Sequence, residues 1–177
     1  MLFSTLVPAI SFTATINLPI ILGNVSTGGT LTYADLVDGT FTSEPDFQPS
    51  VSGKAIRGGD WITIDPSGSI LRLHLDTLIQ TNDSPPEYVR ISATGAETAT
   101  PEVMAVIGAV PGAQAVKYGD FQATSSWTFQ TGSSKYAELQ NAVYVGSTSL
   151  RPGEKEGTIV VGFRIAKVVS VKTDISV

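Results

Sequence analysis

Apolar and polar residues alternate with a period of two along most of the chain, and no other feature limits the fold as strongly. Within residues 11–18, the apolar side chains of one face are Phe12, Ala14, Ile16 and Leu18. Such alternation is typical of β-strands that have one buried face and one exposed face. Because it recurs from one end of the chain to the other, we predict a mainly β protein.

About nine or ten strands are expected, joined by turns rich in Gly, Pro, Asn and Asp. The segments 60–65 and 71–81 flank the turn Asp65-Pro-Ser-Gly68, so they are predicted to form a hairpin. A second turn at residues 81–87 leads into a strand at 88–95. The other strand-like segments are 11–18, 28–36, 38–44, 119–132, 141–148 and 158–171.

Two short helices are predicted to interrupt the strands. In residues 100–112, Thr100 is suited to cap a helix and Pro101 to occupy its first turn. In residues 133–142, one of the two serines that begin the segment is the expected cap.

Many strands with hairpin turns and few helices favour a closed antiparallel β-barrel or a β-sandwich. A barrel of eight or more strands has room for a small ligand, whereas a sandwich does not. The strand glycines Gly58, Gly59 and Gly162 suggest the bulges or bends that barrels need. With 177 residues and no evident linker or repeat, the chain is expected to be a single domain over residues 1–177.

The charge content argues against several classes of partner. The net charge is −5 and the eleven basic residues form no cluster, whereas nucleic acids and anionic membranes need a basic patch. Only 15% of the residues are charged, which suggests that much surface is buried in a core, a pocket or a homodimer interface. The apolar N-terminus lacks the basic segment of a signal peptide, and no run of about 18 apolar residues occurs. We therefore expect a cytoplasmic protein.

The sequence lacks the residue patterns of common cofactor and metal sites. It has no cysteine and one histidine, which disfavours a zinc site. It also lacks a phosphate-binding loop, a dinucleotide fingerprint, a calcium loop and a nucleophile elbow. We expect no cofactor and no metal, so the remaining possibilities are general acid–base chemistry, electrostatics or simple binding.

One predicted strand carries a polar row. In LRLHLDT, at residues 71–77, leucines alternate with Arg72, His74 and Asp76. Consecutive members of the row lie about 6.5–7 Å apart, so their side chains can meet. On the outside of the sheet the row would be a solvated face. Inside a barrel it would be either a compensated ion-pair network or a ligand or catalytic site.

Neighbouring segments add polar and aromatic groups that would meet this row inside a barrel. The candidate catalytic residues are Asp76, His74, Asp60 and Arg90. The candidate substrate-binding residues are Trp61, Arg72, Tyr88, Trp127, Phe129 and Tyr136. Aromatic residues in strands can equally be plain core.

Several segments resemble the family called domain of unknown function 3237. They are GGDWITIDPSG, LIQTNDSPPEYVRISATG, KYGDF and WTFQTGSSKYAELQNAVYVG. The last carries Phe129, Thr131, Gly132, Tyr136, Leu139, Asn141, Val145 and Gly146. The resemblance covers roughly residues 10–168. Relatives commonly carry an acidic and then a basic residue at the positions of His74 and Asp76, and here the order is inverted.

The resemblance implies a lipocalin-like closed antiparallel β-barrel of about 8–10 strands with one or two short helices. It favours an occupied lumen that the row Arg72, His74 and Asp76 faces. Some fungal members of the family resemble this chain, and the resemblance implies a cofactor-free cyclase of polyketide or terpenoid tailoring, with reactions that include addition of a hydroxyl across a prenyl double bond.

From this resemblance, the expected function is a cofactor-independent cyclase or isomerase of secondary metabolism. It would bind an apolar aromatic or prenylated substrate in the lumen and use general acid–base catalysis. The alternative is a non-catalytic carrier of a hydrophobic small molecule. A weaker third possibility is a structural barrel with a filled lumen.

Overall fold

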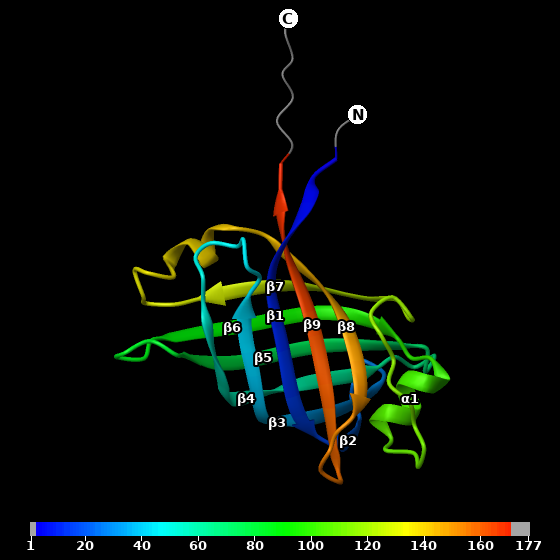
Figure 1. Cartoon of the computed structure of the whole chain (residues 1–177). Coiled ribbons are helices and arrows are strands. Elements are labelled where there is room, and N and C mark those ends of the chain that lie inside the picture. The colour runs from blue at the N-terminus through cyan, green and yellow to red at the C-terminus, as the bar shows by residue number, and fades with distance from the viewer. Residues whose placement is uncertain (1–2, 171–177) are drawn as a thin grey trace, which may run out of the picture.

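The computed structural model describes residues 3–170, which form one antiparallel sheet of nine strands, a short α-helix and a 3₁₀ helix (Figure 1). The strand order is β1-β9-β8-β7-β6-β5-β4-β3-β2, and a further pairing of β1 with β3 closes eight of the strands into a barrel. The predicted closed antiparallel β-barrel is confirmed. The elements are β1 (Thr5–Asn17), β2 (Ile20–Asn24), β3 (Thr30–Ser43), β4 (Ser52–Ile64), β5 (Ile70–Thr81), β6 (Tyr88–Thr98), α1 (Pro101–Ile107), β7 (Ala123–Gln130), η1 (Ala137–Asn141), β8 (Tyr144–Pro152) and β9 (Thr158–Val169).

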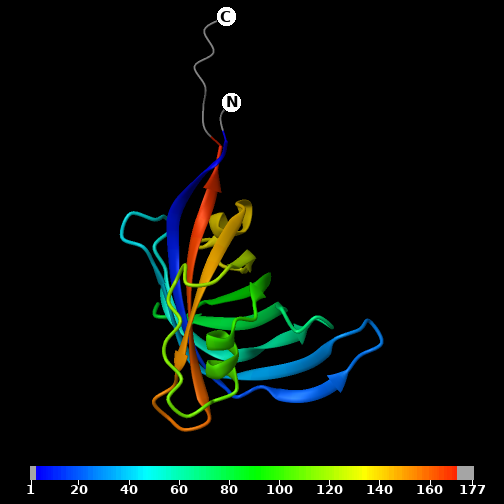
Figure 2. The same cartoon turned by 90° about the vertical axis from the view of Figure 1, so that its right-hand side faces the viewer.

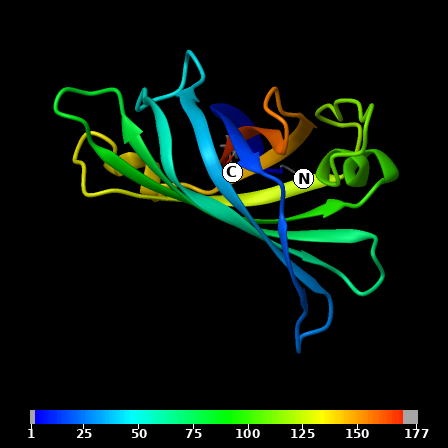
Figure 3. The same cartoon turned by 90° about the horizontal axis from the view of Figure 1, so that it is seen from below.

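The strand β2 lies outside the closed barrel. It pairs with the first half of β3, while the second half of β3 pairs with β1. The hairpin of β2 and β3 therefore projects from one end of the barrel (Figures 2 and 3). The side chains of Ile20, Ile21 and Leu22 on this strand are all more than half exposed.

Period-two alternation sorts the side chains of each barrel strand into an inner and an outer set. In β7, Ala123, Ser125, Trp127 and Phe129 are buried, and the residues between them are exposed. The inner set includes a cluster of aromatic rings. Ring centroids lie 5.8 Å apart for Phe12 and Phe163, and 4.9 Å apart for Trp127 and Phe163. Those of Phe129 and Tyr144 lie 4.7 Å apart. These rings pack against one another and against the buried aliphatic side chains of the other strands, so much of the barrel interior is a packed core.

The strand β4 has an irregular register beside the glycine pair Gly58 and Gly59, where the sequence predicted a bulge or a bend. Its register against β5 shifts between Ala55 and Arg57, and Gly58 adopts a φ of 144°. No comparable irregularity occurs at Gly162, whose pairing with β1 and β8 is regular. The pairing therefore excludes a bulge at Gly162, and the absence of a side chain there leaves room for Tyr118.

The first predicted helix is confirmed and the second is only a 3₁₀ turn. The Thr100 side chain caps α1 by accepting a hydrogen bond from the Val103 N–H at 3.3 Å. The helix η1 begins after Tyr136 and has no side-chain cap, so the expected serine cap is wrong. The Ser133 N–H instead donates to Thr131 Oγ1 at 3.1 Å, which holds the serines in a loop. No helix among residues 3–170 has the length and apolar character needed to cross a bilayer.

Two glycines of the segment 127–146 have opposite surroundings. A Cβ at Gly146 would lie 2.5 Å from Trp127 Nε1 inside the core, whereas a Cβ at Gly132 would meet no atom within 4 Å. We expect Gly146→Ala to lower the free energy of unfolding by about 1–3 kcal/mol, because the buried indole has little space to move. Gly132→Ala should change it by less than about 0.5 kcal/mol. Urea unfolding measures both, and equal effects would contradict this packing.

Candidate functional site

The polar row of β5 lies on the outer surface, so the expectation that it faces the lumen is wrong. Arg72 and His74 are exposed and Asp76 is half-buried, whereas Leu71 and Leu75 belong to the core. Side chains alternate across a strand, so one register cannot bury both sets. Each buried leucine stabilises the fold by roughly 1.5–3 kcal/mol, whereas buried charges destabilise it unless they are paired. The leucines therefore determine which face of β5 points into the barrel.

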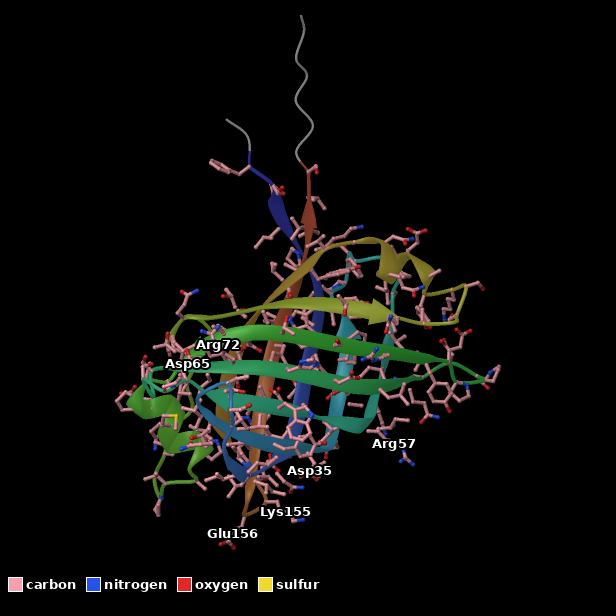
Figure 4. The ribbon with its side chains drawn as sticks, turned by 180° about the vertical axis from the view of Figure 1, so that it is seen from behind. Asp35, Arg57, Asp65, Arg72, Lys155 and Glu156 are labelled. Atoms are coloured by element: carbon pink, nitrogen blue, oxygen red, sulfur yellow. The ribbon has the colours of Figure 1, made fainter. Side chains whose placement is uncertain are left out.

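The charged members of the row form ion pairs on the surface. Arg72 Nε lies 2.9 Å from Asp65 Oδ1 beside the β4–β5 turn (Figure 4). Arg90 donates to Asp76, with 3.0 Å between Nε and Oδ1, and also to Gln130 at 2.7 Å. The hydrogen bonds from Arg90 lower the pKa of the Asp76 carboxyl. Asp76 is therefore ionised at neutral pH and has no proton to donate.

Two of the candidate aromatic residues also lie outside the barrel. Trp61 is 44% exposed and Tyr88 is 48% exposed. The Trp61 ring packs on Tyr33 with 4.6 Å between centroids. Trp127 and Phe129, in contrast, are buried in the barrel interior, where their rings pack within the aromatic core.

Tyr136 is buried at the end of the barrel and holds two loops together. Its hydroxyl donates to Asp83 at 2.6 Å, and Asp83 also accepts a hydrogen bond from Lys135. The hydrogen bonds from Lys135 and Tyr136 lower the pKa of Asp83 to about 2. The segment 131–136 is thereby fixed to the β5–β6 turn. These contacts assign Tyr136 a structural role.

Asp60 is the one candidate carboxylic acid that the structure places inside the barrel. It is 7% exposed and lies between Ala34 on β3 and Leu75 on β5. Its Oδ1 accepts a hydrogen bond from the backbone N–H of His74 at 3.0 Å. Burial raises the pKa of Asp60 to about 7; the bond from His74 opposes this rise and the nearby Glu97 adds to it. A carboxyl with this pKa can donate or accept a proton at neutral pH.

Glu97 is a second buried acid, which the sequence analysis missed. It is 4% exposed, lies opposite Leu71, and burial raises its pKa. The neighbouring Thr148 hydroxyl opposes this rise, yet neither Glu97 Oε1 nor Thr148 Oγ1 has a hydrogen bond of ordinary geometry. The sequence did hold a sign of its burial: in the period-two alternation of β6, Glu97 lies on the same face as the apolar residues Val89 and Ile91.

Beside Asp60 the interior leaves a cavity of about 20 Å³, which also touches Thr77 and Phe163. This space is enough for about one water molecule. A larger cavity of about 310 Å³ opens at the barrel mouth, between β2 and α1. We call it the mouth cavity. It is lined by Leu18, Pro19, Ile21, Thr32, Ile62, Ile64, Leu71, Met104, Ile107 and Gly108.

The mouth cavity and Asp60 lie along the same inner face of β4. Ile62 lines the cavity, and Asp60 follows two residues deeper, at about 7 Å along the strand. Leu71 lines the cavity too and lies opposite Glu97 on β6. The arrangement places two protonatable carboxyls below an apolar entrance. Within residues 3–170, no three His, Asp or Glu side chains gather in a way that would hold a metal ion.

Comparison with known proteins gives the family. Residues 4–168 match the family described as protein of unknown function (DUF3237). The chain belongs to this family. No curated protein matches it.

Solved structures with the same fold come from bacteria and a fungus. A protein of unknown function from Clostridium acetobutylicum is 20% identical, with a TM-score of 0.68 over 93% of this chain and 99% of that one. A conserved protein of unknown function from Rhodopseudomonas palustris is 16% identical, with a TM-score of 0.74 over 96% and 100%. An enzyme from Penicillium herquei is 18% identical, with a TM-score of 0.60 over 96% and 97%. At these identities the likeness shows the fold alone.

The raised pKa of Asp60 predicts a pH dependence of stability. Between pH 3.8 and about 7, the folded protein keeps a proton that the unfolded chain releases. Asp60 therefore lowers the free energy of unfolding progressively as the pH rises. Asp60→Asn removes this loss and keeps an oxygen that can accept from His74. The free energy of unfolding of Asp60→Asn, relative to that of the parent, should therefore rise by up to about 4 kcal/mol between pH 4 and pH 8, at about 1.4 kcal/mol per pKa unit.

Asp76→Asn is the matched control for this prediction, and urea unfolding at both pH values is the measurement. The pKa of Asp76 is lowered in the folded state, so its contribution is present above the unfolded pKa and is lost as the pH falls. The Asp76→Asn variant should therefore be slightly less stable than the parent at pH 8, by less than about 1 kcal/mol because the pair is exposed. Between pH 4 and pH 8, the stability relative to the parent should therefore rise for Asp60→Asn and fall for Asp76→Asn. A change of the same sign for both variants would contradict the assignment of Asp60 to the interior.

Proposed function

We propose that this protein is a cofactor-independent cyclase or isomerase of secondary metabolism, which acts on a small apolar, aromatic or prenylated substrate by general acid–base catalysis. The observation that carries the proposal is the buried Asp60 carboxyl beneath the apolar mouth cavity. The shared fold with an enzyme from Penicillium herquei is consistent with it.

In the proposed reaction, the apolar part of the substrate binds in the mouth cavity and its reacting end reaches Asp60. Protonated Asp60 donates its proton to an alkene carbon and becomes a carboxylate. A hydroxyl of the same molecule attacks the carbocation, forms the new C–O bond and returns its proton to Asp60. The atoms balance within one molecule, so the product is an isomer of the substrate and no co-reactant is needed.

The surroundings of Asp60 suit this step. The negative charge that develops on Asp60 and the cationic substrate form a close pair in a site of low dielectric, where their attraction is strong. The ring of Phe163 borders the same small cavity, and an aromatic face attracts a cation. The space beside Asp60 is about 20 Å³, so side chains at the inner end of the mouth cavity must move aside for the substrate.

The alternative is a non-catalytic carrier of a hydrophobic small molecule. One observation favours it: no residue that lines the mouth cavity has an ionisable side chain. A carrier would bind its ligand there by apolar contact, and Asp60 would not matter. The two functions therefore differ in their dependence on Asp60.

The test is turnover of a panel of prenylated phenols, followed by chromatography for products of unchanged mass. In D₂O the proposed reaction should place one deuterium on carbon. Asp60→Asn should lower the rate by about 10²–10⁴-fold, the usual contribution of a general acid. Asp76→Asn and His74→Gln, on the outer face, should leave it unchanged. The rate of the parent should fall as the pH rises through about 7, because only protonated Asp60 is active.

Binding measurements on the same panel separate the two functions. Met104→Trp partly fills the mouth cavity and should weaken binding for a catalyst and for a carrier alike. Binding without product, with an affinity that Asp60→Asn leaves unchanged, would favour the carrier. Turnover that survives Asp60→Asn would overturn the proposed acid.

A further inference from the structure

We propose that a second cavity, on the outer surface of β1, β8 and β9, binds a small organic oxyanion, meaning a molecule that carries a carboxylate or phosphate group. The cavity holds about 390 Å³ and lies between these strands and the segment 115–118. In Figure 1 the chain between α1 and β7 passes beside β8 at this place. The site lies outside the barrel, so it is independent of the function proposed for Asp60.

The floor of this cavity is a glycine between two hydroxyl-bearing residues. Gly162 on β9 pairs with Thr13 on β1 and with Ser149 on β8, and all three residues line the cavity. A Cβ at Gly162 would lie 2.5 Å from Tyr118 Oη and 2.7 Å from Ser149 Oγ. Because Gly162 has no side chain, the hydroxyls of Tyr118 and Ser149 can both lie above its backbone. Hydroxyls can donate hydrogen bonds to an oxyanion.

The wall of the cavity is held in place by backbone hydrogen bonds. The Val116 N–H donates to the Leu150 carbonyl at 2.8 Å, and the Leu150 N–H donates to the Val116 carbonyl at 2.9 Å. The Tyr118 ring lies against the Arg164 guanidinium, at 6.0 Å from its centroid. A cavity built in this way needs little reorganisation to bind a ligand, which favours affinity.

The charges of the cavity select the ligand. Lys117 and Arg151 line it, and no carboxylate does. The ion pairs found within residues 3–170 involve Arg72, Arg90, Lys135 and Arg164, so neither Lys117 nor Arg151 takes part in one. The nearby Asp120 is directed to the loop, where it accepts a hydrogen bond from the Lys117 backbone N–H at 2.8 Å.

An arginine and a lysine among hydroxyls are the groups that bind carboxylates and phosphates. In a chain of net charge −5, two cations without a carboxylate partner in one cavity are a local departure from the composition. The volume of about 390 Å³ falls within the range of small-molecule sites and exceeds the needs of a bare phosphate. Ala115 and Val160 provide apolar wall for the rest of the ligand. The site therefore suits a small aromatic or aliphatic acid or a phosphomonoester.

The test is a titration followed by amide NMR, with phenyl phosphate, benzoate and inorganic phosphate as probes at constant ionic strength. We expect shifts at the amides of Lys117, Ser149 and Gly162. Arg151→Gln should weaken binding of the organic probes about ten-fold, the loss of one charge-assisted contact. The matched control is Arg57→Gln, since Arg57 is an exposed arginine on the opposite side of the barrel (Figure 4) and takes part in none of the ion pairs within residues 3–170. It should have no effect.

The probes and the variants separate the outcomes. Stronger binding of phenyl phosphate than of benzoate assigns a phosphomonoester, and the reverse assigns a carboxylate; either supports the site. Equal effects of Arg151→Gln and Arg57→Gln would overturn it, because the binding would then be non-specific charge attraction. Absence of shifts at these amides with about 10 mM of every probe would also overturn it.

Discussion

The pairing of β1 with β3 is the interaction on which the rest of the structure depends. It joins β1, at one end of the antiparallel sheet, to β3, the last strand but one at the other end, with Phe12 opposite Phe41 and Ala14 opposite Gly39. An open sheet of these strands would expose its apolar face and two strand edges to water. Closure turns that face into an interior, in which the aromatic rings pack and the polar groups lose their water.

The shifted pKa values of Asp60 and Glu97 follow from this closure. On an open sheet both carboxyls would be hydrated and would titrate near their ordinary values. Inside the barrel, burial penalises their charged forms and raises both pKa values, and the charge of Glu97 further raises the pKa of Asp60. On the outer face, Asp76 meets water and Arg90, and its pKa moves in the opposite direction. Whether an acid lies on the inner or the outer face of the barrel sheet therefore determines the direction of its pKa shift.

The sequence predicted the barrel well, because alternation and turn residues are local signals. It predicted the direction of the β5 row wrongly. Burial of the leucines of LRLHLDT stabilises the fold more than burial of its charged side chains, so the leucines occupy the inner face of β5. The same phase rule applied to β4 groups Asp60 with Ile62 and Ile64, on the inside, and sends Trp61 outside. The cavities could not be predicted, because they depend on how β2, α1 and the segment 115–118 fold back across the barrel.

Two acids inside a small barrel destabilise the fold, and this cost favours a functional role for them over a structural one. Well-packed apolar residues in place of buried ionisable groups are often neutral or stabilising. Glu97 Oε1 and Thr148 Oγ1 lack hydrogen bonds of ordinary geometry, which adds to the cost. The aromatic cluster and the closed hydrogen-bonded sheet tolerate this cost. Perturbed and incompletely satisfied acids are concentrated at functional sites, whereas the exposed and paired row of β5 has the character of ordinary protein surface.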